Sequence, residues 1–432
     1  MSLAEIRLWG KSIGAVRWDP HQKIGFFEYA PEFQKSNIQL SPLQMPLSDT
    51  IYRFPSLNPD SFHGLPGLLS DSLPDRFGNA LIDAWLSREG INREDFNPVQ
   101  RLCYVGKRAV GALEFLPVLQ YARFKYEDDI HLDAIIDLAN EVLLNRSSLN
   151  ATLNDPHKTE SIKQILQVGT SAGGARAKAL IAWNPETNKI RSGQVHTEKG
   201  FEHWILKFDG ITSTQDHDIQ DSKGYGLIEY TYSLMAKQSG IHMNPCHLLQ
   251  ENGRSHFMTK RFDRTDDGKK IHMQSLCAMD HLDYNQAGAH SYEQAIGVMQ
   301  ALHLPMEDIE EFIKRAAFNI LSRNQDDHTK NISFLMNKAG EWRLAPAYDV
   351  TYNYNPKGIW TKTHQMSING KVDDFILEDL IALGKRASLS KSRTLNLLNE
   401  VKEGIHQWQH LAAKTDIPTP LIRQIHQTFR TL

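Results

Sequence analysis

The first thirty residues alternate between apolar and polar side chains, and glycines stand where the alternation stops. Alternation with a period of two is typical of a strand that buries one face. The pattern predicts strands over residues 3–8 and 13–18 and a third strand over 24–29. Short strands joined by tight turns indicate a meander at this end of the chain.

The following stretch mixes the two periodicities. Apolar residues recur at helical spacing over residues 77–85, after a proline-containing turn, and predict a helix there. Residues 102–117 alternate apolar stretches with glycines, which predicts a hairpin. A helix is expected at about 130–146. The polar segment 145–160 carries helix-stop residues, so the main domain boundary is expected there or slightly earlier.

Three later apolar runs have the length of buried strands, and they lie at residues 179–183, 203–208 and 255–262. A helical period separates the last two, over residues 226–239. From about residue 285 the pattern is helical, most clearly over 307–322, 376–383 and 394–411. We therefore expect an α+β fold, with a small α/β N-terminal domain, then strands with one helix, then a helical end.

Composition narrows the possible classes of protein. The 432 residues carry 48 Lys and Arg against 51 Asp and Glu, a formal net charge of −3. The chain therefore lacks the basic excess that is typical of a nucleic-acid binder. Hydrophobic residues make up 41% and charged residues 23%, which is typical of a globular protein and excludes a disordered one. The three cysteines are far apart, which argues against a disulfide scaffold or a cysteine-rich zinc module.

No apolar run approaches the roughly 20 residues of a transmembrane helix. Glu5 and Arg7 place charges near the N-terminus with no apolar segment after them, unlike a signal peptide. The expected location is the cytoplasm, with no membrane partner.

The strongest chemical signal is the segment 323–331, RNQDDHTKN. Asp326 and Asn331 are five residues apart, the spacing of the catalytic base and the magnesium-binding asparagine in protein kinases. Phosphoryl transfer needs a carboxylate to accept the hydroxyl proton and a neutral oxygen ligand for the metal, and Lys330 adds a cation for a phosphate. The alternative explanation is a polar turn at the end of a helix.

Asp349 follows an apolar, proline-containing run eighteen residues later. A carboxylate at a strand end suits a second Mg²⁺ ligand, although a simple turn aspartate is the alternative. Upstream, residues 168–178 form a glycine-rich segment whose backbone could approach phosphates closely, or else a flexible hairpin turn. It lacks the closing Gly-Lys-Ser/Thr of a P-loop.

Lys207 lies in an apolar, strand-like segment, and Glu229 lies on the next predicted helix. A strand lysine paired with a helix glutamate positions the α- and β-phosphates in kinases. A lysine at a sheet edge and a solvated glutamate are the alternative. Each feature is weak alone. The order of glycine loop, lysine, glutamate, Asp-x₄-Asn and aspartate is that of a two-lobed kinase, which chance hardly explains.

These residues resemble the HipA family of bacterial serine/threonine kinases, which are toxins of type II toxin–antitoxin operons. The resemblance includes residues 68–75 and 105–112, and in the kinase part residues 171–178, 260–264 and 326–331. It implies an N-terminal HipA-type subdomain over 1–125, a kinase N-lobe with a preceding helical linker over 126–264, and a helical C-lobe over 265–432.

The resemblance also implies the roles of individual residues. Asp326 is the expected catalytic base, and Asn331 and Asp349 are the expected Mg²⁺ ligands. Contacts to ATP are expected from Gly173, Gly174, Ala175, Arg176, Ala177, Lys178, Lys207, Lys260, Arg261, Phe262, His328, Lys330 and Asn331. Residues 260–262 form the adenine-reading hinge, with Lys260 where the family commonly has glutamate. Gln325 stands where kinases usually carry an arginine, so control through a phosphate bound at that position is not expected.

Further expectations concern regulation and partners. Ser171 corresponds to the family's inactivating autophosphorylation site, and Thr170 lies beside it. The expected cofactors are ATP and Mg²⁺. The expected partners are a protein substrate from translation such as an aminoacyl-tRNA synthetase, a helix-turn-helix antitoxin of the HipB type, and operator DNA through that complex. The alternatives are a small-molecule kinase on the same fold and a catalytically silent co-repressor scaffold.

Overall fold

The computed structural model describes residues 2–119, 135–136, 177–193, 199–210 and 224–432. The chain divides into two compact units. Unit 1 comprises Met1–Thr214, Met258–Gln274 and Met336–Gly340, and unit 2 comprises Gln215–Phe257, Ser275–Leu335 and Glu341–Leu432. Each unit is described by itself below, and the predicted domain boundaries at 125 and 264 stay predictions. Across the described ranges, no helix is both long and apolar enough to cross a membrane.

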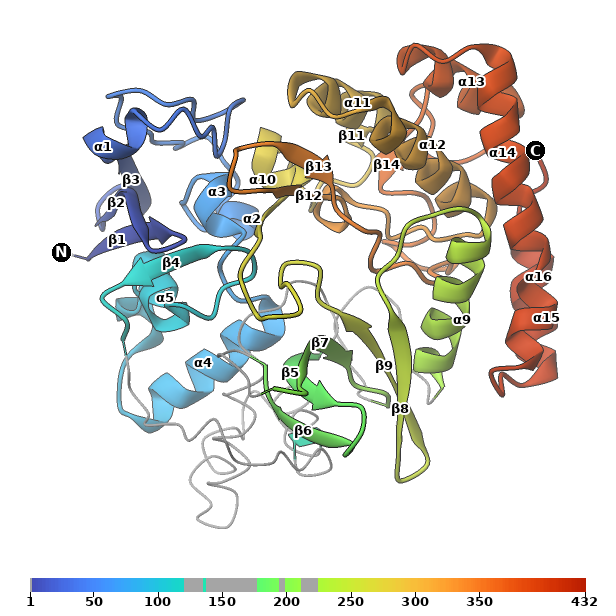
Figure 1. Cartoon of the computed structure of the whole chain (residues 1–432), viewed down its shortest axis with the longest axis horizontal. Coiled ribbons are helices and arrows are strands. Elements are labelled where there is room, and N and C mark those ends of the chain that lie inside the picture. The colour runs from blue at the N-terminus through green and yellow to red at the C-terminus, as the bar shows by residue number, and fades with distance from the viewer. Residues whose placement is uncertain (1, 120–134, 137–176, 194–198, 211–223) are drawn as a thin grey trace. The chain divides into compact units, whose positions relative to one another are not determined.

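Unit 1 begins with a four-stranded antiparallel sheet of order β3-β2-β1-β4 (Figure 1). Its strands are β1 (Leu3–Leu8), β2 (Lys11–Asp19), β3 (Ile24–Tyr29) and β4 (Leu113–Leu116). Ala4, Ile6 and Leu8 of β1 are buried, as the alternation predicts. The three predicted strands are therefore confirmed.

The predicted hairpin over residues 102–117 is wrong, because a helix occupies its first part. Helix α5 (Pro98–Val105) begins after Asn97, whose side chain accepts hydrogen bonds from the N–H groups of Val99 and Gln100. Gln100 in turn accepts from the Asn97 N–H, which completes a capping box. The helix packs on β1, β2 and β4, and only the second half of the segment is a strand.

Short helices and turns connect β3 to α5. They are α1 (Pro31–Gln34), α2 (Pro59–Phe62), α3 (Gly67–Ser70), the longer α4 (Arg76–Arg88) and the 3₁₀ turn η1 (Arg93–Asp95). Helix α4 confirms the helix predicted over 77–85. Its first residue follows Asp75, whose carboxylate accepts a hydrogen bond from the Gly78 N–H at 2.7 Å.

A second sheet has the strand order β6-β5-β7-β9-β8. The strands are β5 (Lys178–Asn184), β6 (Lys189–Ser192), β7 (Glu202–Lys207), β8 (Cys246–Glu251) and β9 (Arg254–Lys260). The apolar runs at 179–183, 203–208 and 255–262 are confirmed as β5, β7 and β9. The pattern did not predict β6 and β8, which lie at the two edges and expose part of their side chains.

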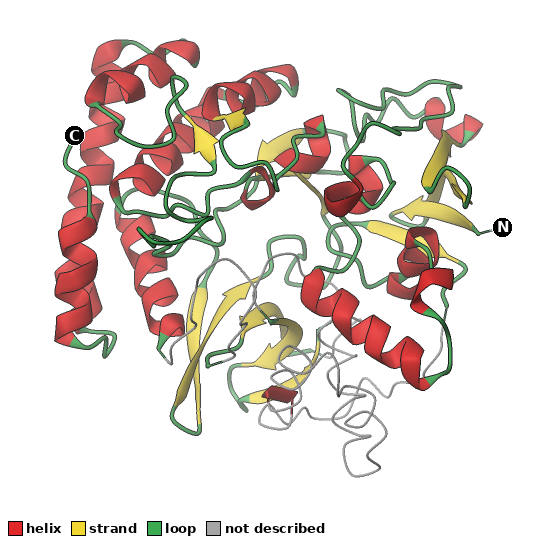
Figure 2. Ribbon diagram, turned by 180° about the vertical axis from the view of Figure 1, so that it is seen from behind, coloured by secondary structure: helices red, strands yellow, loops and turns green. Residues whose placement is uncertain are grey.

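Helices make up most of unit 2, as Figure 2 shows in red. They are α9 (Tyr225–Gln238), α10 (Leu276–Asp280), α11 (Tyr292–Ala301), α12 (Met306–Leu321), α13 (Leu377–Arg386), α14 (Lys391–His406), α15 (Trp408–Ala413) and α16 (Thr419–Thr428). The helices predicted over 226–239, 307–322 and 376–383 are confirmed. The helix predicted over 394–411 is two helices, because Gln407 interrupts it.

Buried aromatic rings join three of these helices. The ring of Tyr232 on α9 meets Phe318 of α12 at 6.1 Å and Trp408 of α15 at 5.4 Å, both edge to face. The Tyr232 hydroxyl donates to the Ser322 carbonyl at 2.6 Å, at the end of α12. This aromatic core therefore fixes the end of α12, directly before the segment 323–331.

Short strands that the helical pattern did not predict lie between residues 272 and 367. They are β10 (His272–Ser275), β11 (His290–Ser291), β12 (Ser333–Met336), β13 (Trp342–Leu344) and β14 (Met366–Ser367), and β12 follows the 3₁₀ turn η3 (Thr329–Asn331). In unit 2, β12 lies beside β13 and β11 pairs in parallel with β14. These strands hold the ends of the loops that carry Asp326, Asn331 and Asp349.

Candidate active site

The segment 323–331 brings Asp326 and Asn331 together. The Asn331 side-chain amide donates to the Asp326 carbonyl oxygen at 2.8 Å, which closes the turn between α12 and β12. With its nitrogen committed to that bond, the amide oxygen of Asn331 is directed away from this carbonyl. The hydrogen bond therefore holds the Asn331 amide group next to the backbone of Asp326.

The Asp326 carboxylate is only partly buried, with 24% of its side chain exposed. Its Oδ1 accepts a hydrogen bond from the indole Nε1 of Trp360 at 2.7 Å. His328 Nε2 lies 3.9 Å from the same oxygen. The carboxylate is therefore oriented by a neutral donor and stays accessible to a substrate hydroxyl.

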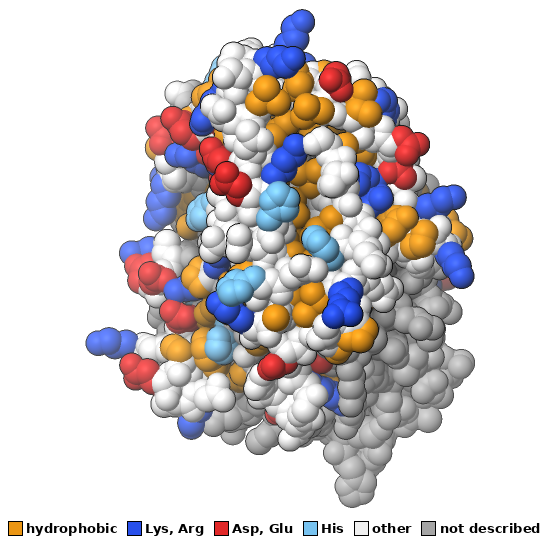
Figure 3. All heavy atoms as spheres, turned by 90° about the vertical axis from the view of Figure 1, so that its right-hand side faces the viewer, with side chains coloured by type: hydrophobic (Ala, Val, Ile, Leu, Met, Phe, Trp, Pro, Cys, Tyr) orange, Lys and Arg blue, Asp and Glu red, His pale blue; other side chains and the backbone are white. Residues whose placement is uncertain are grey.

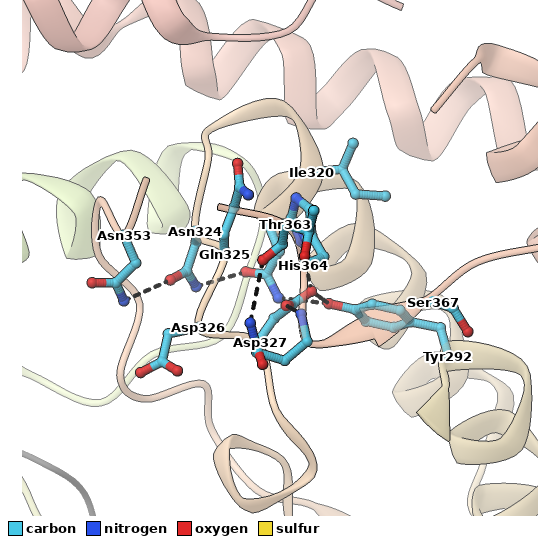
Figure 4. Close-up of polar contacts among 12 residues, drawn as sticks. Tyr292, Ile320, Asn324, Gln325, Asp326, Asp327, Asn353, Thr363, His364 and Ser367 are labelled. Carbon is cyan, nitrogen blue, oxygen red and sulfur yellow. Dashed lines mark hydrogen bonds and ion pairs between the residues drawn. The ribbon is translucent and has the colours of Figure 1, made fainter. Parts of the chain in front are cut away.

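Asp327 points the opposite way, into the core of unit 2 (Figure 4). It accepts hydrogen bonds from the Tyr292 hydroxyl at 2.7 Å, from His364 Nδ1 at 2.8 Å and from the Gln365 N–H at 2.8 Å. Burial raises the pKa of Asp327, but His364 and these hydrogen bonds outweigh it and hold the pKa below its usual value. Asp327 thus anchors the loop as a buried carboxylate.

The ring of His364 continues this network to the C-terminal segment. Arg430 donates through NH1 to His364 Nε2 at 2.8 Å. Because an arginine can only donate, Nε2 is the acceptor and Nδ1 carries the proton that points at Asp327. Arg430 also pairs with Asp373 and donates to the Ile320 carbonyl at 2.9 Å. The sequence did not indicate His364, Asp373 or Arg430, since 38 to 104 positions separate them from Asp326.

Asp349 follows β13 with a left-handed backbone conformation, φ 53°. The preceding Tyr348 donates its hydroxyl to the Lys330 carbonyl at 2.7 Å, and Ser333 lies 2.5 Å from the same hydroxyl. Tyr348 therefore ties the segment of Asp349 to the segment that ends at Asn331. Within unit 2, the structure places the two predicted metal ligands on adjoining, tethered segments.

The donor set fits Mg²⁺. Carboxylates and an amide oxygen are the hard ligands that this ion prefers, and it keeps several waters and phosphate oxygens as further ligands. Among the described residues, no three His, Cys, Asp or Glu side chains gather as a metal cluster. Asn331 and Asp349 are the residues that would hold the ion.

His328 and Lys330 flank the aromatic ring of Tyr284. The Lys330 ammonium lies 4.8 Å from the ring centroid, and the His328 ring lies 5.5 Å from it. A cation over an aromatic face is stabilised by the ring's electron density. Tyr284 therefore contacts both of these side chains, which are predicted to contact ATP.

In unit 1, Lys178 and Lys207 are directly opposite each other on the neighbouring strands β5 and β7. Both side chains are largely buried, at 6% and 9% exposure. Directly opposite residues of an antiparallel pair share one face of the sheet, and like charges there repel. Two buried ammonium groups on one face are a suitable arrangement for binding the phosphates of a nucleotide.

Some predicted site residues fall outside the described residues. They are the predicted nucleotide contacts Gly173, Gly174, Ala175 and Arg176, and the predicted autophosphorylation site Ser171 with its neighbour Thr170. Ala177 is buried, and its carbonyl accepts from the Phe208 N–H at 3.3 Å. Glu229 is buried on α9 in unit 2, whereas Lys207 belongs to unit 1, so their predicted ion pair stays a prediction.

Side chains of the predicted hinge have partners in unit 1. Lys260 pairs with Glu202 at 2.8 Å and with Asp266 at 2.9 Å. Burial lowers the pKa of Lys260, but these two acids outweigh it and raise the pKa above its usual value. Phe262 is half-buried. A role of the hinge in reading adenine stays a prediction.

Arg261 belongs to a buried ionic cluster. Its guanidinium binds the Asp263 carboxylate at 2.8 and 2.7 Å, and Arg264 approaches the same carboxylate at 2.8 Å. The Gly111 N–H also donates to Asp263. Burial raises the pKa of Asp263, but Arg261, Arg264 and these hydrogen bonds outweigh it and hold the pKa well below its usual value. The Arg261 N–H donates to the His203 carbonyl at 2.9 Å. This cluster fixes the hinge to residues 109–111, which the sequence did not indicate.

Comparison with known proteins gives two matching family models. The HipA N-terminal domain matches residues 4–116, and the HipA-like C-terminal domain matches residues 170–409. Curated relatives include a Haemophilus influenzae protein named "Putative kinase", 26% identical over 40% of this chain, and "Putative kinase Y4dM" of Sinorhizobium fredii, 28% identical over 37%. The matches span 58% and 39% of the length of those relatives.

A solved structure, the "Shewanella oneidensis MR-1 Toxin Antitoxin System HipA, HipB and its operator DNA complex", matches 98% of this chain and 95% of that chain with a TM-score of 0.68. At 17% identity this likeness shows the fold, and it confirms the predicted α/β N-terminal domain followed by a two-lobed, kinase-like domain with a helical C-lobe. The C-terminal family model alone covers more than half of the sequence. The chain therefore belongs to the HipA family.

Proposed function

We propose that this chain is an ATP- and Mg²⁺-dependent serine/threonine protein kinase. The closed turn in which Asn331 binds the Asp326 carbonyl carries this proposal, because it sets a carboxylate base beside a neutral oxygen ligand. In the reaction, a serine or threonine oxygen bonds to the γ-phosphorus of ATP. The bond from that phosphorus to the bridging oxygen breaks, ADP leaves, and Asp326 accepts the hydroxyl proton.

The other predicted residues bind and orient the nucleotide. Lys178 and Lys207 hold its phosphates, together with the glycine loop over 173–178. Lys260, Arg261 and Phe262 form the adenine hinge, and His328 and Lys330 contact ATP from the catalytic loop. Asn331 and Asp349 would hold Mg²⁺, which supplies neutralisation of the charge that develops on the phosphates.

The family supports a biological role as the toxin of a type II toxin–antitoxin module. The named Shewanella structure is a complex of HipA, HipB and operator DNA. We infer a HipB-type antitoxin with a helix-turn-helix fold as partner of this chain, and contact with operator DNA through that complex. The inferred substrate is a component of translation such as an aminoacyl-tRNA synthetase. The inferred location of the protein is the cytoplasm.

Incubation of the purified protein with radiolabelled ATP and Mg²⁺ tests the activity. A protein kinase transfers label to itself or to a purified protein, and chelation of Mg²⁺ with EDTA abolishes the transfer. Label found only on metabolites would favour the small-molecule kinase. Absence of both transfer and Mg·ATP binding would favour the co-repressor scaffold.

We also propose that Ser171 is autophosphorylated and that the modification inactivates the kinase. A phosphoserine carries nearly two negative charges, and the glycine loop has to approach the phosphates of ATP, so the charges repel. Phosphopeptide mapping after autokinase reaction is expected to find the phosphate on Ser171, and the Ser171→Ala variant is expected to keep its activity during the incubation. Full ATP affinity in quantitatively Ser171-phosphorylated protein would contradict this regulation.

A further inference from the structure

The loop over residues 355–363 is held closed by its own backbone. The Asn355 N–H donates to the Thr361 carbonyl at 3.3 Å, and the Gly358 N–H donates to the Asn355 carbonyl at 3.0 Å. The Asn355 side chain also accepts from the Lys357 N–H at 3.1 Å. The segment is therefore a compact loop with a defined tip.

Two buried glutamines fasten this loop to the rest of unit 2. Gln325, fully buried and adjacent to Asp326, donates to the carbonyls of Thr361 at 3.4 Å and Lys362 at 3.0 Å. Gln365 donates to the Trp360 carbonyl at 2.6 Å. Gln325 stands where kinases usually carry a phosphate-binding arginine. Its neutral amide holds the backbone of the loop directly, so the loop needs no phosphate to be ordered.

The tip of the loop combines a contact to the catalytic base with an exposed apolar side chain. Trp360 binds Asp326 Oδ1 at 2.7 Å, and Ile359, the residue before it, is 95% exposed. The other large hydrophobic residues exposed in unit 2 are Ile376 at 49% and Met306 at 43%. Ile359 is therefore the most exposed of these apolar side chains, and it lies on a loop that Gln325 and Gln365 hold in place next to Asp326.

We propose that Ile359 is a substrate-docking residue of the kinase, which contacts an aliphatic side chain of the polypeptide that Asp326 phosphorylates. The Trp360 indole contacts the Asp326 carboxylate at 2.7 Å, and the Cα atom of Ile359 lies about 3.8 Å from that of Trp360. With the length of the tryptophan side chain added, the Cα atom of Ile359 lies roughly 12 Å at most from the catalytic carboxylate. An extended peptide rises about 3.3 Å per residue. The aliphatic side chain therefore lies within about four residues of the phosphorylated serine or threonine. This inference rests on the proposed kinase function.

The test is a peptide library with one central serine and one varied position on either side, phosphorylated by the wild-type protein and by Ile359→Glu. The wild-type protein is expected to prefer Leu, Ile, Val or Met at one position within four residues of the serine. For peptides with that residue, Ile359→Glu is expected to raise KM roughly ten- to hundredfold and to shift the preference to Lys or Arg, with KM for ATP unchanged. Ile376→Glu, the matched control, keeps the wild-type preference.

Three outcomes overturn the inference. One is an identical preference in the wild-type protein and in Ile359→Glu, and another is a wild-type protein without aliphatic preference. The third is a protein that phosphorylates itself but no peptide. A wild-type protein that transfers phosphate to nothing, itself included, overturns the proposed function, and the inference falls with it.

Discussion

Asp326 and Asp327 are adjacent acids with different surroundings. Asp327 is buried and receives three hydrogen bonds, whereas Asp326 is partly exposed and receives one from Trp360. The two acids point in opposite directions, so Asp327 anchors the loop and Asp326 stays accessible for the catalytic role proposed for it. The Trp360 indole is the group that orients Asp326.

Replacement of Trp360 by phenylalanine is expected to lower kcat for phosphoryl transfer about tenfold and to leave ATP affinity unchanged. The variant keeps an aromatic ring but loses the N–H donor, and a hydrogen bond to a charged group contributes about 1.5–3 kcal/mol. Trp360 is a positioning residue, so its loss changes the rate rather than nucleotide binding. Steady-state kinetics with varied ATP measure both quantities.

Trp408→Phe is the matched control. That indole is buried and donates to the Ile422 carbonyl at 3.1 Å, away from the catalytic loop. Its loss is expected to lower thermal stability without a tenfold loss in kcat. Equal kinetic losses in the two variants would contradict a specific role of Trp360.

At the scale of elements, the end of α16 and the residues after it support the catalytic loop. Thr428 accepts a hydrogen bond from the Arg323 side chain at 2.7 Å, and the Arg430 N–H donates to the Leu321 carbonyl at 3.0 Å. Arg430 also binds His364, which in turn holds Asp327. The last helix and the loop are therefore one network.

Arg430→Ala is expected to lower kcat about tenfold with KM for ATP within a factor of two. The change removes the donor that fixes the His364 tautomer, so the anchor of Asp327 loosens while the nucleotide-binding residues remain. Arg423→Ala, on the exposed face of α16, is the control and is expected to behave like the wild type. A parallel rise in KM for ATP would indicate a general structural defect instead.

Periodicity predicted the elements that bury one regular face, such as β1, β5, α9 and α12. It failed over 102–117, where the Asn97–Pro98 cap outweighed the glycine spacing. It also missed the edge strands β6 and β8, which bury too little to leave a pattern. Local propensity is weak where tertiary contacts decide the element.

The candidate site likewise contains residues that the sequence indicated and residues that it did not. Asp326 and Asn331 belong to one short motif, so their spacing alone singled out both residues, and the structure joins them by a hydrogen bond. Tyr292, His364 and Arg430 meet the loop only through the fold, and no local pattern records such contacts. Short sequence motifs therefore indicate the candidate chemical groups but not the residues that hold them in place.

Across the whole molecule, buried histidines make stability depend on pH. Burial lowers the pKa of His272 to about 3 and that of His203 to about 4, from ordinary values near 6.5. Histidines exposed on the face in Figure 3, by contrast, are hydrated in the folded state too. On unfolding below about pH 6.5, the buried rings take up protons, so acid favours the unfolded chain.

Between pH 7 and pH 5, the wild-type protein is expected to lose about 2 kcal/mol more unfolding free energy than His272→Phe, because His272 contributes 1.36 kcal/mol per pH unit below 6.5. Urea denaturation at both pH values measures the difference. His410→Phe, at an exposed position on α15, is the control and should follow the wild type. Parallel curves for wild type and His272→Phe would contradict the expectation.

The most direct test of the kinase assignment compares phosphoryl transfer with Mg·ATP binding in Asp326→Asn and Asp349→Asn. Asp326 acts only when the hydroxyl proton is transferred, so Asp326→Asn is expected to abolish transfer and to keep Mg·ATP affinity close to that of the wild type. Asp349→Asn removes a metal ligand and is expected to weaken Mg·ATP binding itself. Calorimetric titration with Mg·ATP and a radiolabel assay on the same preparations give both quantities. Undiminished transfer by Asp326→Asn, or equal loss of binding in both variants, would contradict the account.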